Sequence, residues 1–226
     1  MQIEKLGDEI WSIDELLSEK NYRSIMEEFK PMHNNICFLK KDNVDDTYPG
    51  MRHISYPKWG QIMKHDAKQK GQGLGDNLNL IYMGEIIKYT VQKILRRNVY
   101  LNRINTNVQF PLQEATLHQD GGQNSWSVVL FVCSMWDPEW GGDFVCLENQ
   151  RHVYVPYKPN NAVLINGFLV HRGAAPNYFA PMERVSIAWT YKEVNNDTYE
   201  DGFRETRNSN PRGREDDGLR GEGFQP

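Results

Sequence analysis

The stretch Thr-Leu-His-Gln-Asp-Gly-Gly at residues 116–122 determines how the rest of this 226-residue chain is interpreted. Alternate side chains of an extended strand point to the same face, so His118 and Asp120 place an imidazole and a carboxylate side by side. A second histidine, His171, follows later in the chain, directly after the apolar run 162–170. The pattern predicts that two strands distant in sequence bring these three side chains together.

Two imidazoles and one carboxylate on one side of a metal ion form the facial triad of non-haem Fe(II) enzymes. We therefore predict that His118, Asp120 and His171 bind Fe(II). The alternatives are a solvated strand end for the first two and a core histidine bonded to backbone for the third, but these leave the ordered spacing unexplained. His152 competes with His171, although it follows a turn at 148–151.

A tryptophan-rich and acidic segment, Trp-Asp-Pro-Glu-Trp-Gly-Gly-Asp-Phe, occupies residues 136–144 between the two histidines. Together with His-x-Asp, the distal histidine and a later arginine, it resembles the Fe(II)/2-oxoglutarate-dependent oxygenases, most closely the prolyl-4-hydroxylase-like members. The resemblance covers residues 99–191. It implies a jelly-roll enzyme that hydroxylates a C–H bond of its substrate and releases succinate and CO2.

The same resemblance assigns roles to individual residues. His118, Asp120 and His171 become catalytic metal ligands, and Arg184 would hold the distal carboxylate of 2-oxoglutarate, with Ser186 as a further donor. A guanidinium inside an apolar barrel needs an anionic partner, and its fork matches a carboxylate. The alternative for Arg184 is an internal salt bridge. The implied cofactors are Fe(II), 2-oxoglutarate and O2, and ascorbate is a candidate reductant.

The substrate stays open at this point. Peptidyl proline is the first expectation and a small molecule the second, because the run 128–134 lacks the tyrosine that prolyl-hydroxylase-like enzymes commonly carry after His-x-Asp. Two different functions also stay open: oxidative demethylation of nucleobases, and a non-catalytic metal-binding jelly-roll module. Asn102, Arg103 and Asn105 are either pocket residues or the polar face of an edge strand.

The hydrophobic periodicity predicts an α+β, mainly β fold: a double-stranded β-helix, or jelly roll, with N-terminal supporting helices. Ser12 and Glu15 have the form of a capping box and predict a first helix that ends at Pro31. A second helix is expected from Asp76 to about Arg97. Residues 31–76 carry loop punctuation and form either a lid or the cover of one barrel face.

From Val99 onward the apolar period changes to two. Strands are expected over residues 99–107, 115–118, 127–134, 143–147, 152–155, 162–166, 169–171 and 184–192. The predicted organisation is therefore helical and loop support over residues 1–98, a jelly-roll catalytic core over 99–193 and a polar, flexible tail over 194–226.

Composition restricts the partners. A net charge of −4 gives no reason to expect nucleic-acid or membrane binding. The three cysteines show no paired spacing, which favours a reducing compartment without disulfides, and neither a signal peptide nor a membrane-spanning run is evident. We expect a cytoplasmic protein that acts on a peptide, protein or small molecule, and the sequence leaves its oligomeric state open.

Overall fold

The computed structural model describes residues 1–29, 38–41, 52–55, 63–64 and 78–194. It divides into two compact units, Met1–Glu193 and Val194–Pro226, and the following account concerns the first. No helix in the described ranges is long and apolar enough to cross a membrane.

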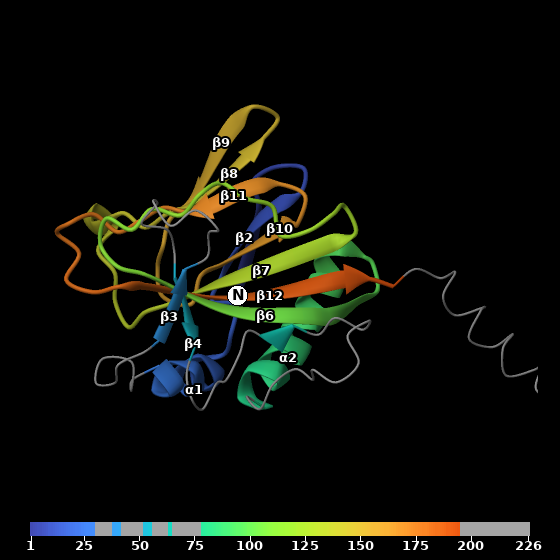
Figure 1. Ribbon diagram of the computed structural model, residues 1–226. Coiled ribbons are helices and arrows are strands. Elements are labelled where there is room, and N and C mark those ends of the chain that lie inside the picture. Colours follow the sequence, from blue (N-terminus) through green and yellow to red (C-terminus); the bar gives the residue numbers. More distant parts are fainter. Residues whose placement is uncertain (30–37, 42–51, 56–62, 65–77, 195–226) are drawn as a thin grey trace, which may run out of the picture. The chain divides into compact units, whose positions relative to one another are not determined.

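Two antiparallel sheets form the body of this unit (Figure 1). The larger sheet has the strand order β1-β2-β10-β7-β12-β6-β4-β3, and β5 pairs with β6 outside this path. Its strands are β1 (Gln2–Lys5), β2 (Ile10–Asp14), β3 (Phe38–Lys41), β4 (Arg52–Ser55), β5 (Met63–Lys64), β6 (Val99–Gln109), β7 (Ser125–Val132), β10 (Ala162–Asn166) and β12 (Arg184–Glu193). The smaller sheet has the order β11-β8-β9, built from β8 (Phe144–Glu148), β9 (Arg151–Val155) and β11 (Val170–Gly173).

The central strands of the larger sheet are apolar on both faces because both faces are covered. All eight residues of β7 are buried. Val128 and Leu130 pack on the helices, whereas Val129 and Phe131 pack in the core between the two sheets. A strand covered on both sides is expected to lose the alternation of apolar and polar residues.

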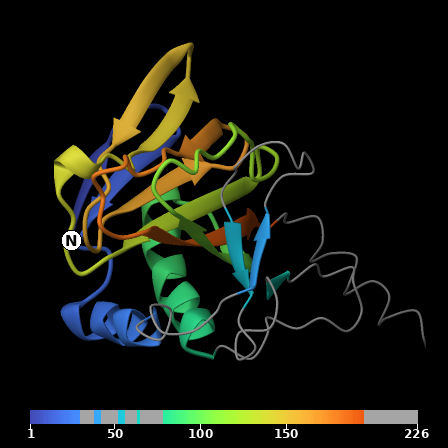
Figure 2. The same ribbon diagram turned by 60° about the vertical axis from the view of Figure 1, so that its left-hand side comes forward.

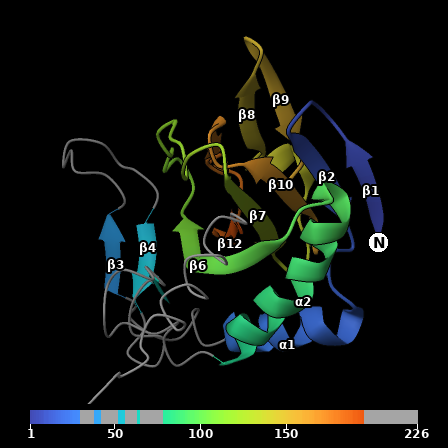
Figure 3. The ribbon, with the colours of Figure 1, turned by 90° about the vertical axis from the view of Figure 1, so that its right-hand side faces the viewer.

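Helices α1 (Glu19–Phe29) and α2 (Leu78–Leu95) lie on the face of the larger sheet that is turned away from the smaller sheet (Figures 2 and 3). Gly84 brings α2 close to β12, because a Cβ there would stand 2.8 Å from the Trp189 ring. The Trp189 indole donates to the carbonyl of Leu80 at 2.9 Å, and the Tyr191 hydroxyl donates to the carbonyl of Gly84 at 2.8 Å. The helices therefore support the sheet from outside and leave its inner face to the site.

The two-sheet arrangement agrees with the predicted jelly roll, and the expected strands from Val99 onward appear with one exception. Residues 115–118 form no strand, and their β pairing is the single bridge between His118 and His171. Ala162–Asn166 has the predicted bounds, and the other strands shift by one or two residues at their ends.

The capping box predicted at Ser12 is wrong. Ser12 lies in β2, between β1 and β10, and helix α1 begins only at Glu19, where the Ser18 hydroxyl accepts a hydrogen bond from the Asn21 amide at 3.3 Å. Ile10 and Ile13 are fully buried in the sheet. Long-range pairing and burial therefore outweigh the local helix signal.

The region 31–76 contains β3, β4 and β5, which add to the edge of the larger sheet beside β6. The described parts of this region therefore extend the sheet at its edge, and the choice between a lid and a cover of one barrel face stays a prediction. Pro31, Asp76 and the histidines at 33 and 65 lie outside the described residues.

Candidate metal centre

The backbone brings the three predicted ligands together. His118 and His171 form an isolated antiparallel bridge in which each backbone amide donates to the other carbonyl, at 3.0 and 2.9 Å. Nε2 of His118 lies 3.9 Å from Oδ1 of Asp120, and Nε2 of His171 lies 3.6 Å from Oδ2. Two donors at right angles around an ion, each about 2.1 Å away, would stand about 3 Å apart. The arrangement fits a metal ion with little movement.

Both imidazoles are held in the tautomer that a metal requires. Nδ1 of His118 lies 2.9 Å from the Thr116 carbonyl, and Nδ1 of His171 lies 2.8 Å from the Leu169 carbonyl. A carbonyl accepts only, so each Nδ1 carries the proton and each Nε2 keeps its lone pair directed toward Asp120. The competing His152 is exposed on β9, against Tyr154, and takes no part in the cluster.

The electrostatics of the cluster also suit a divalent cation. Burial lowers the pKa of His171 more than the nearby Asp120 raises it, so this imidazole is held neutral. Burial alone would raise the pKa of Asp120, but the hydrogen bond from the Ser127 hydroxyl and the charge of Arg103 oppose it, and the pKa of this carboxyl is lowered. Neutral imidazole and carboxylate are the ligand forms that bind Fe(II).

Arg184 lies fully inside the two-sheet body, with only 1% of its surface exposed. Its Nε donates to the Gly142 carbonyl at 2.7 Å, and Nη1 contacts the Gln109 side-chain oxygen at 3.0 Å and the Ser186 hydroxyl at 3.3 Å. The guanidinium lies over the ring of Tyr157, at 4.9 Å from its centroid. Nη2 is buried and has no hydrogen-bond partner among the described residues, and the charge of Asp143 acts on this arginine without a hydrogen bond to it.

This geometry leaves a specific set of donors for an anion. The hydrogens of Nε and Nη1 are used, so the two hydrogens of Nη2 remain, together with the hydroxyl hydrogen of Ser186. Burial lowers the pKa of Arg184, and an anion beside Nη2 would oppose that effect. The sequence suggested a two-nitrogen fork, whereas the structure leaves Nη2 and Ser186 as the available pair.

Four residues that hold Arg184 were not predicted from the sequence: Gln109, Gly142, Tyr157 and Gly173. The Gln109 amide donates to the Gly173 carbonyl at 2.9 Å, which turns its oxygen toward Arg184. Gly141 and Gly142 have positive φ angles of 69° and 84°, which explains the Gly-Gly pair and directs the Gly142 carbonyl inward. The Gly-Gly pair was the feature of the sequence that could have indicated this contact, whereas nothing in the sequence pointed to Gln109 or Tyr157.

No protein-family model matches the sequence, and no curated protein matches it. Several solved structures are similar to this chain. A prolyl-4-hydroxylase from Pseudomonas putida matches with a TM-score of 0.55 and 16% identity, over 82% of this chain and 93% of that one. A prolyl hydroxylase from Trichoplax adhaerens, in complex with a hypoxia-inducible-factor peptide, matches with a TM-score of 0.59 and 9% identity, over 82% and 84%.

HygX from Streptomyces hygroscopicus, with nickel, 2-oxoglutarate and hygromycin B bound, matches with a TM-score of 0.55 and 10% identity, over 81% of this chain and 82% of that one. This chain has the 2-oxoglutarate-Fe(II) oxygenase fold. The jelly-roll prediction is therefore confirmed. At these identities the oxygenase fold is what the comparisons establish, and the chemistry has to be argued from the site.

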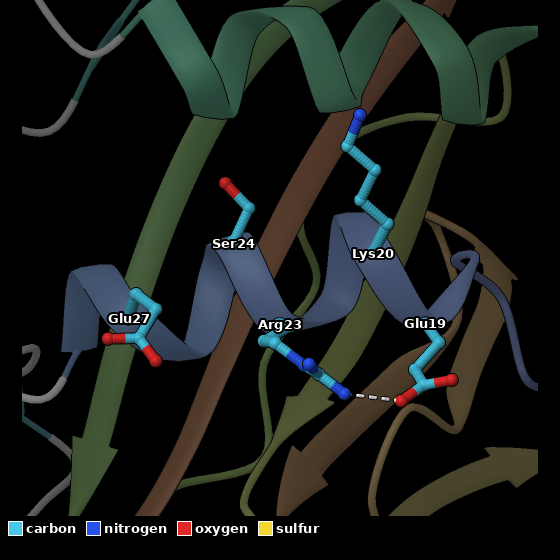
Figure 4. A pocket seen from close by; sticks show the side chains of 5 residues that line it. All are labelled: Glu19, Lys20, Arg23, Ser24 and Glu27. Atoms are coloured by element: carbon cyan, nitrogen blue, oxygen red, sulfur yellow. Dashed lines mark hydrogen bonds and ion pairs between the residues drawn. The ribbon is translucent and has the colours of Figure 1, made fainter.

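A hollow of about 430 Å³ lies along α1, away from the centre of this oxygenase fold (Figure 4). Its lining comes from one helix: Glu19, Lys20, Arg23, Ser24 and Glu27. Charges of both signs line it, and Arg23 pairs with Glu19 at 2.5 Å. Because α1 packs on the outer face of the larger sheet, the hollow is separated from the His118 cluster by that sheet.

Proposed function

We propose that the protein is an Fe(II)/2-oxoglutarate-dependent dioxygenase. His118, Asp120 and His171 bind Fe(II), and Arg184 with Ser186 binds the distal carboxylate of 2-oxoglutarate. The observation that carries the proposal is the buried Arg184 guanidinium, whose Nη2 lacks a partner among the described residues. A buried charge without an anionic partner is unfavourable unless a ligand supplies one.

The position of Arg184 supports the same conclusion. Every second residue of β12 points to the face turned toward the smaller sheet: Arg184, Ser186, Ala188 and Thr190. Thr190 lies within 3.4 Å of the Ser127 hydroxyl, which donates to Asp120 at 2.6 Å. One wall of the interior therefore runs from the anion site to the metal ligands, as a short dicarboxylate that contacts both would require.

The chain's own contribution is to bind and orient. His118, Asp120 and His171 would hold Fe(II), and this set of two imidazoles and one carboxylate is the one that non-haem Fe(II) oxygenases use. When bound, Fe(II) with 2-oxoglutarate and O2 supplies the oxidising power for hydroxylation of a C–H bond, with succinate and CO2 as products. Arg184 and Ser186 hold the distal carboxylate, and the aromatic rings of Phe131 and Tyr157 beside Arg184 keep water from it. Ascorbate is a candidate reductant.

Peptidyl proline is the first candidate substrate that we propose, and a small molecule is the second. The similar structures include a prolyl hydroxylase with a peptide and HygX with hygromycin B, so the fold accommodates both classes in other proteins. Oxidative demethylation of nucleobases is less well supported, because the net charge of −4 does not favour nucleic acid. A non-catalytic metal-binding module would have no need for Arg184 in its interior.

The test is succinate formation with Fe(II), 2-oxoglutarate and ascorbate, in the presence of candidate substrates. His118→Ala should abolish turnover because it removes a metal ligand. Arg184→Ala should raise the KM for 2-oxoglutarate by roughly 10- to 100-fold, the range expected from losing hydrogen bonds to a charged group. Unchanged turnover in both variants would refute the proposal.

Metal titration separates the enzyme from the non-catalytic module. Arg184→Ala should bind Mn(II) as the parent does, since Arg184 contacts none of the three ligands in the structure. A parent protein that binds metal but forms no succinate with any candidate would favour the module.

A further inference from the structure

Three side chains from three neighbouring strands form a row beside Asp120. Arg103 on β6 and Ser127 on β7 both stand opposite Thr190 on β12, which lies between these strands. The Ser127 and Thr190 hydroxyls are 3.4 Å apart. The row lies on the inner face of the larger sheet, so it faces the candidate metal centre rather than the helices.

A β-bulge places Arg103 in this row. The register between β12 and β6 shifts between Thr190 and Tyr191, so that Asn102 is an extra residue on β6. Leu101 and Ile104 can then both pack in the helix-side core, while Arg103 points inward. Bulges redirect side chains in this way and are frequent beside active sites.

The row holds both oxygens of Asp120. Arg103 Nη2 donates to Oδ1 at 3.2 Å, and the Ser127 hydroxyl donates to Oδ2 at 2.6 Å. With the Asn105 amide turned so that its oxygen faces Arg103, the arginine Nε donates to it at 3.2 Å. The guanidinium is therefore fixed at two of its nitrogens and cannot easily leave the carboxylate.

We propose that Arg103 is a positioning residue for the metal centre. Its hydrogen bond occupies one oxygen of Asp120, so that the carboxylate binds the ion through the other oxygen alone. The inference rests on the proposed metal site. Outer partners of metal ligands orient them and commonly change metal affinity by 10- to 100-fold. A single-oxygen carboxylate also preserves the open positions that the proposed reaction needs.

Charge repulsion and positioning predict opposite changes in metal affinity when Arg103 is removed. A guanidinium beside a divalent cation is repelled by it, so charge alone predicts that removing Arg103 tightens metal binding. Positioning predicts the opposite, because a carboxylate freed from Arg103 turns away from the productive orientation.

The experiment measures the affinity of the full chain for Co(II) by calorimetry, without 2-oxoglutarate, together with the visible spectrum of the bound Co(II). Arg103→Gln should weaken binding by about 10- to 100-fold. It should also change the spectrum, because a carboxylate that turns away from the productive orientation alters the coordination geometry of the bound Co(II). Arg103→Lys should give a smaller loss, since the ammonium keeps the charge and one donor but loses the fork.

Arg172→Gln is the matched control. Arg172 follows His171 directly, yet it pairs with Glu114 at 3.4 Å instead of Asp120, so its loss should leave Co(II) affinity unchanged. Equal or tighter binding by Arg103→Gln would overturn the proposal, as would an equal loss in Arg172→Gln. If Arg103→Gln does not fold, Arg103→Lys decides, and parent-like affinity and spectrum there would overturn it.

These readouts are independent of turnover. A parent protein that binds Co(II) but forms no succinate with Fe(II) would refute the proposed function and leave the role of Arg103 standing. If the parent forms succinate but Arg103→Gln binds Co(II) more tightly, the proposed function stands and the positioning role of Arg103 is refuted.

Discussion

Gly173 lies directly against the guanidinium of Arg184, two residues after the candidate metal ligand His171. A Cβ at this position would stand 2.8 Å from Cζ and Nη1 of Arg184 and 2.8 Å from the Gln109 side-chain oxygen. Both side chains are held by hydrogen bonds inside the core, so neither can move without losing some of them. The smallest side chain would therefore displace the residue that we propose binds 2-oxoglutarate.

Gly173→Ala should raise the KM for 2-oxoglutarate by about 10-fold or more, in proportion to the hydrogen bonds that the displaced arginine loses. Metal affinity should change little, since His171 remains on β11. Gly122→Ala is the control, because a Cβ there meets nothing within 4 Å although Gly122 is only two residues from Asp120. Equal kinetic effects of the two substitutions would contradict this account.

Cys133 and Cys146 illustrate burial without reactivity. Burial raises the pKa of each thiol to about 12, so the thiolate that reacts with alkylating reagents is almost absent at pH 8 and increases only as the pH approaches 12. Both should resist iodoacetamide at pH 8 in the native protein and react in denaturant, as peptide mapping by mass spectrometry would show. Equal labelling rates in the two conditions would contradict the prediction.

The Tyr22 side chain forms a polar tie between helix α1 and the end of β7. Its hydroxyl donates to the Cys133 carbonyl at 2.8 Å and accepts from the Cys133 amide at 3.0 Å, just beyond the end of β7. Burial raises the pKa of this hydroxyl to about 12, so it stays protonated and keeps its donor through the physiological range. The helix and the strand are therefore joined by polar as well as apolar contacts.

Tyr22→Phe should lower the free energy of unfolding by about 1–3 kcal/mol, because it leaves a backbone amide and carbonyl without their partner. Tyr82→Phe on α2 removes a hydroxyl from a side chain that is 60% exposed, and should change stability by no more than about 0.5 kcal/mol. Urea unfolding midpoints of the two variants measure this difference in stability. Indistinguishable midpoints would contradict a stabilising role of the Tyr22 hydroxyl.

The whole unit from Met1 to Glu193 should respond to metal and co-substrate together. The candidate ligands come from the bridge segment at His118, from Asp120 and from β11, while the proposed anion site lies on β12, so bound ligands would connect both sheets. Ligands that bind only the folded state stabilise it by about 2.7 kcal/mol at 100 times Kd. For a domain of this size that corresponds to a rise in Tm of roughly 5–10 °C.

Thermal melting with Mn(II) and 2-oxoglutarate measures this effect. Mn(II) alone should give part of the rise, 2-oxoglutarate alone little, and chelation by EDTA should reverse it. An unchanged Tm with both ligands present would argue against the site, and Gly122→Ala should melt and respond as the parent does.

Local pattern was enough for the candidate ligands His118 and Asp120 and for most of the strands, because both depend on neighbours in the chain, whereas His171 reaches them through the long-range bridge to His118. Alternate residues of extended backbone share a face, which pairs His118 with Asp120 in the sequence, and short apolar runs separated by turn residues mark the strands after Val99. Arg184 stood out because a guanidinium in an apolar strand needs an anion, and the structure finds it buried with an unused nitrogen.

Tertiary structure alone decided the surroundings of those residues. Arg103 and Ser127 line up beside Asp120 because β6 and β7 both pair with β12, and Gln109 reaches Arg184 across 75 positions of the chain. Register is set by the packing of both sheet faces and by a bulge, and neither can be read from composition or spacing. Ser12 became part of a strand for the same reason: burial between β1 and β10 stabilises more than a helix cap does.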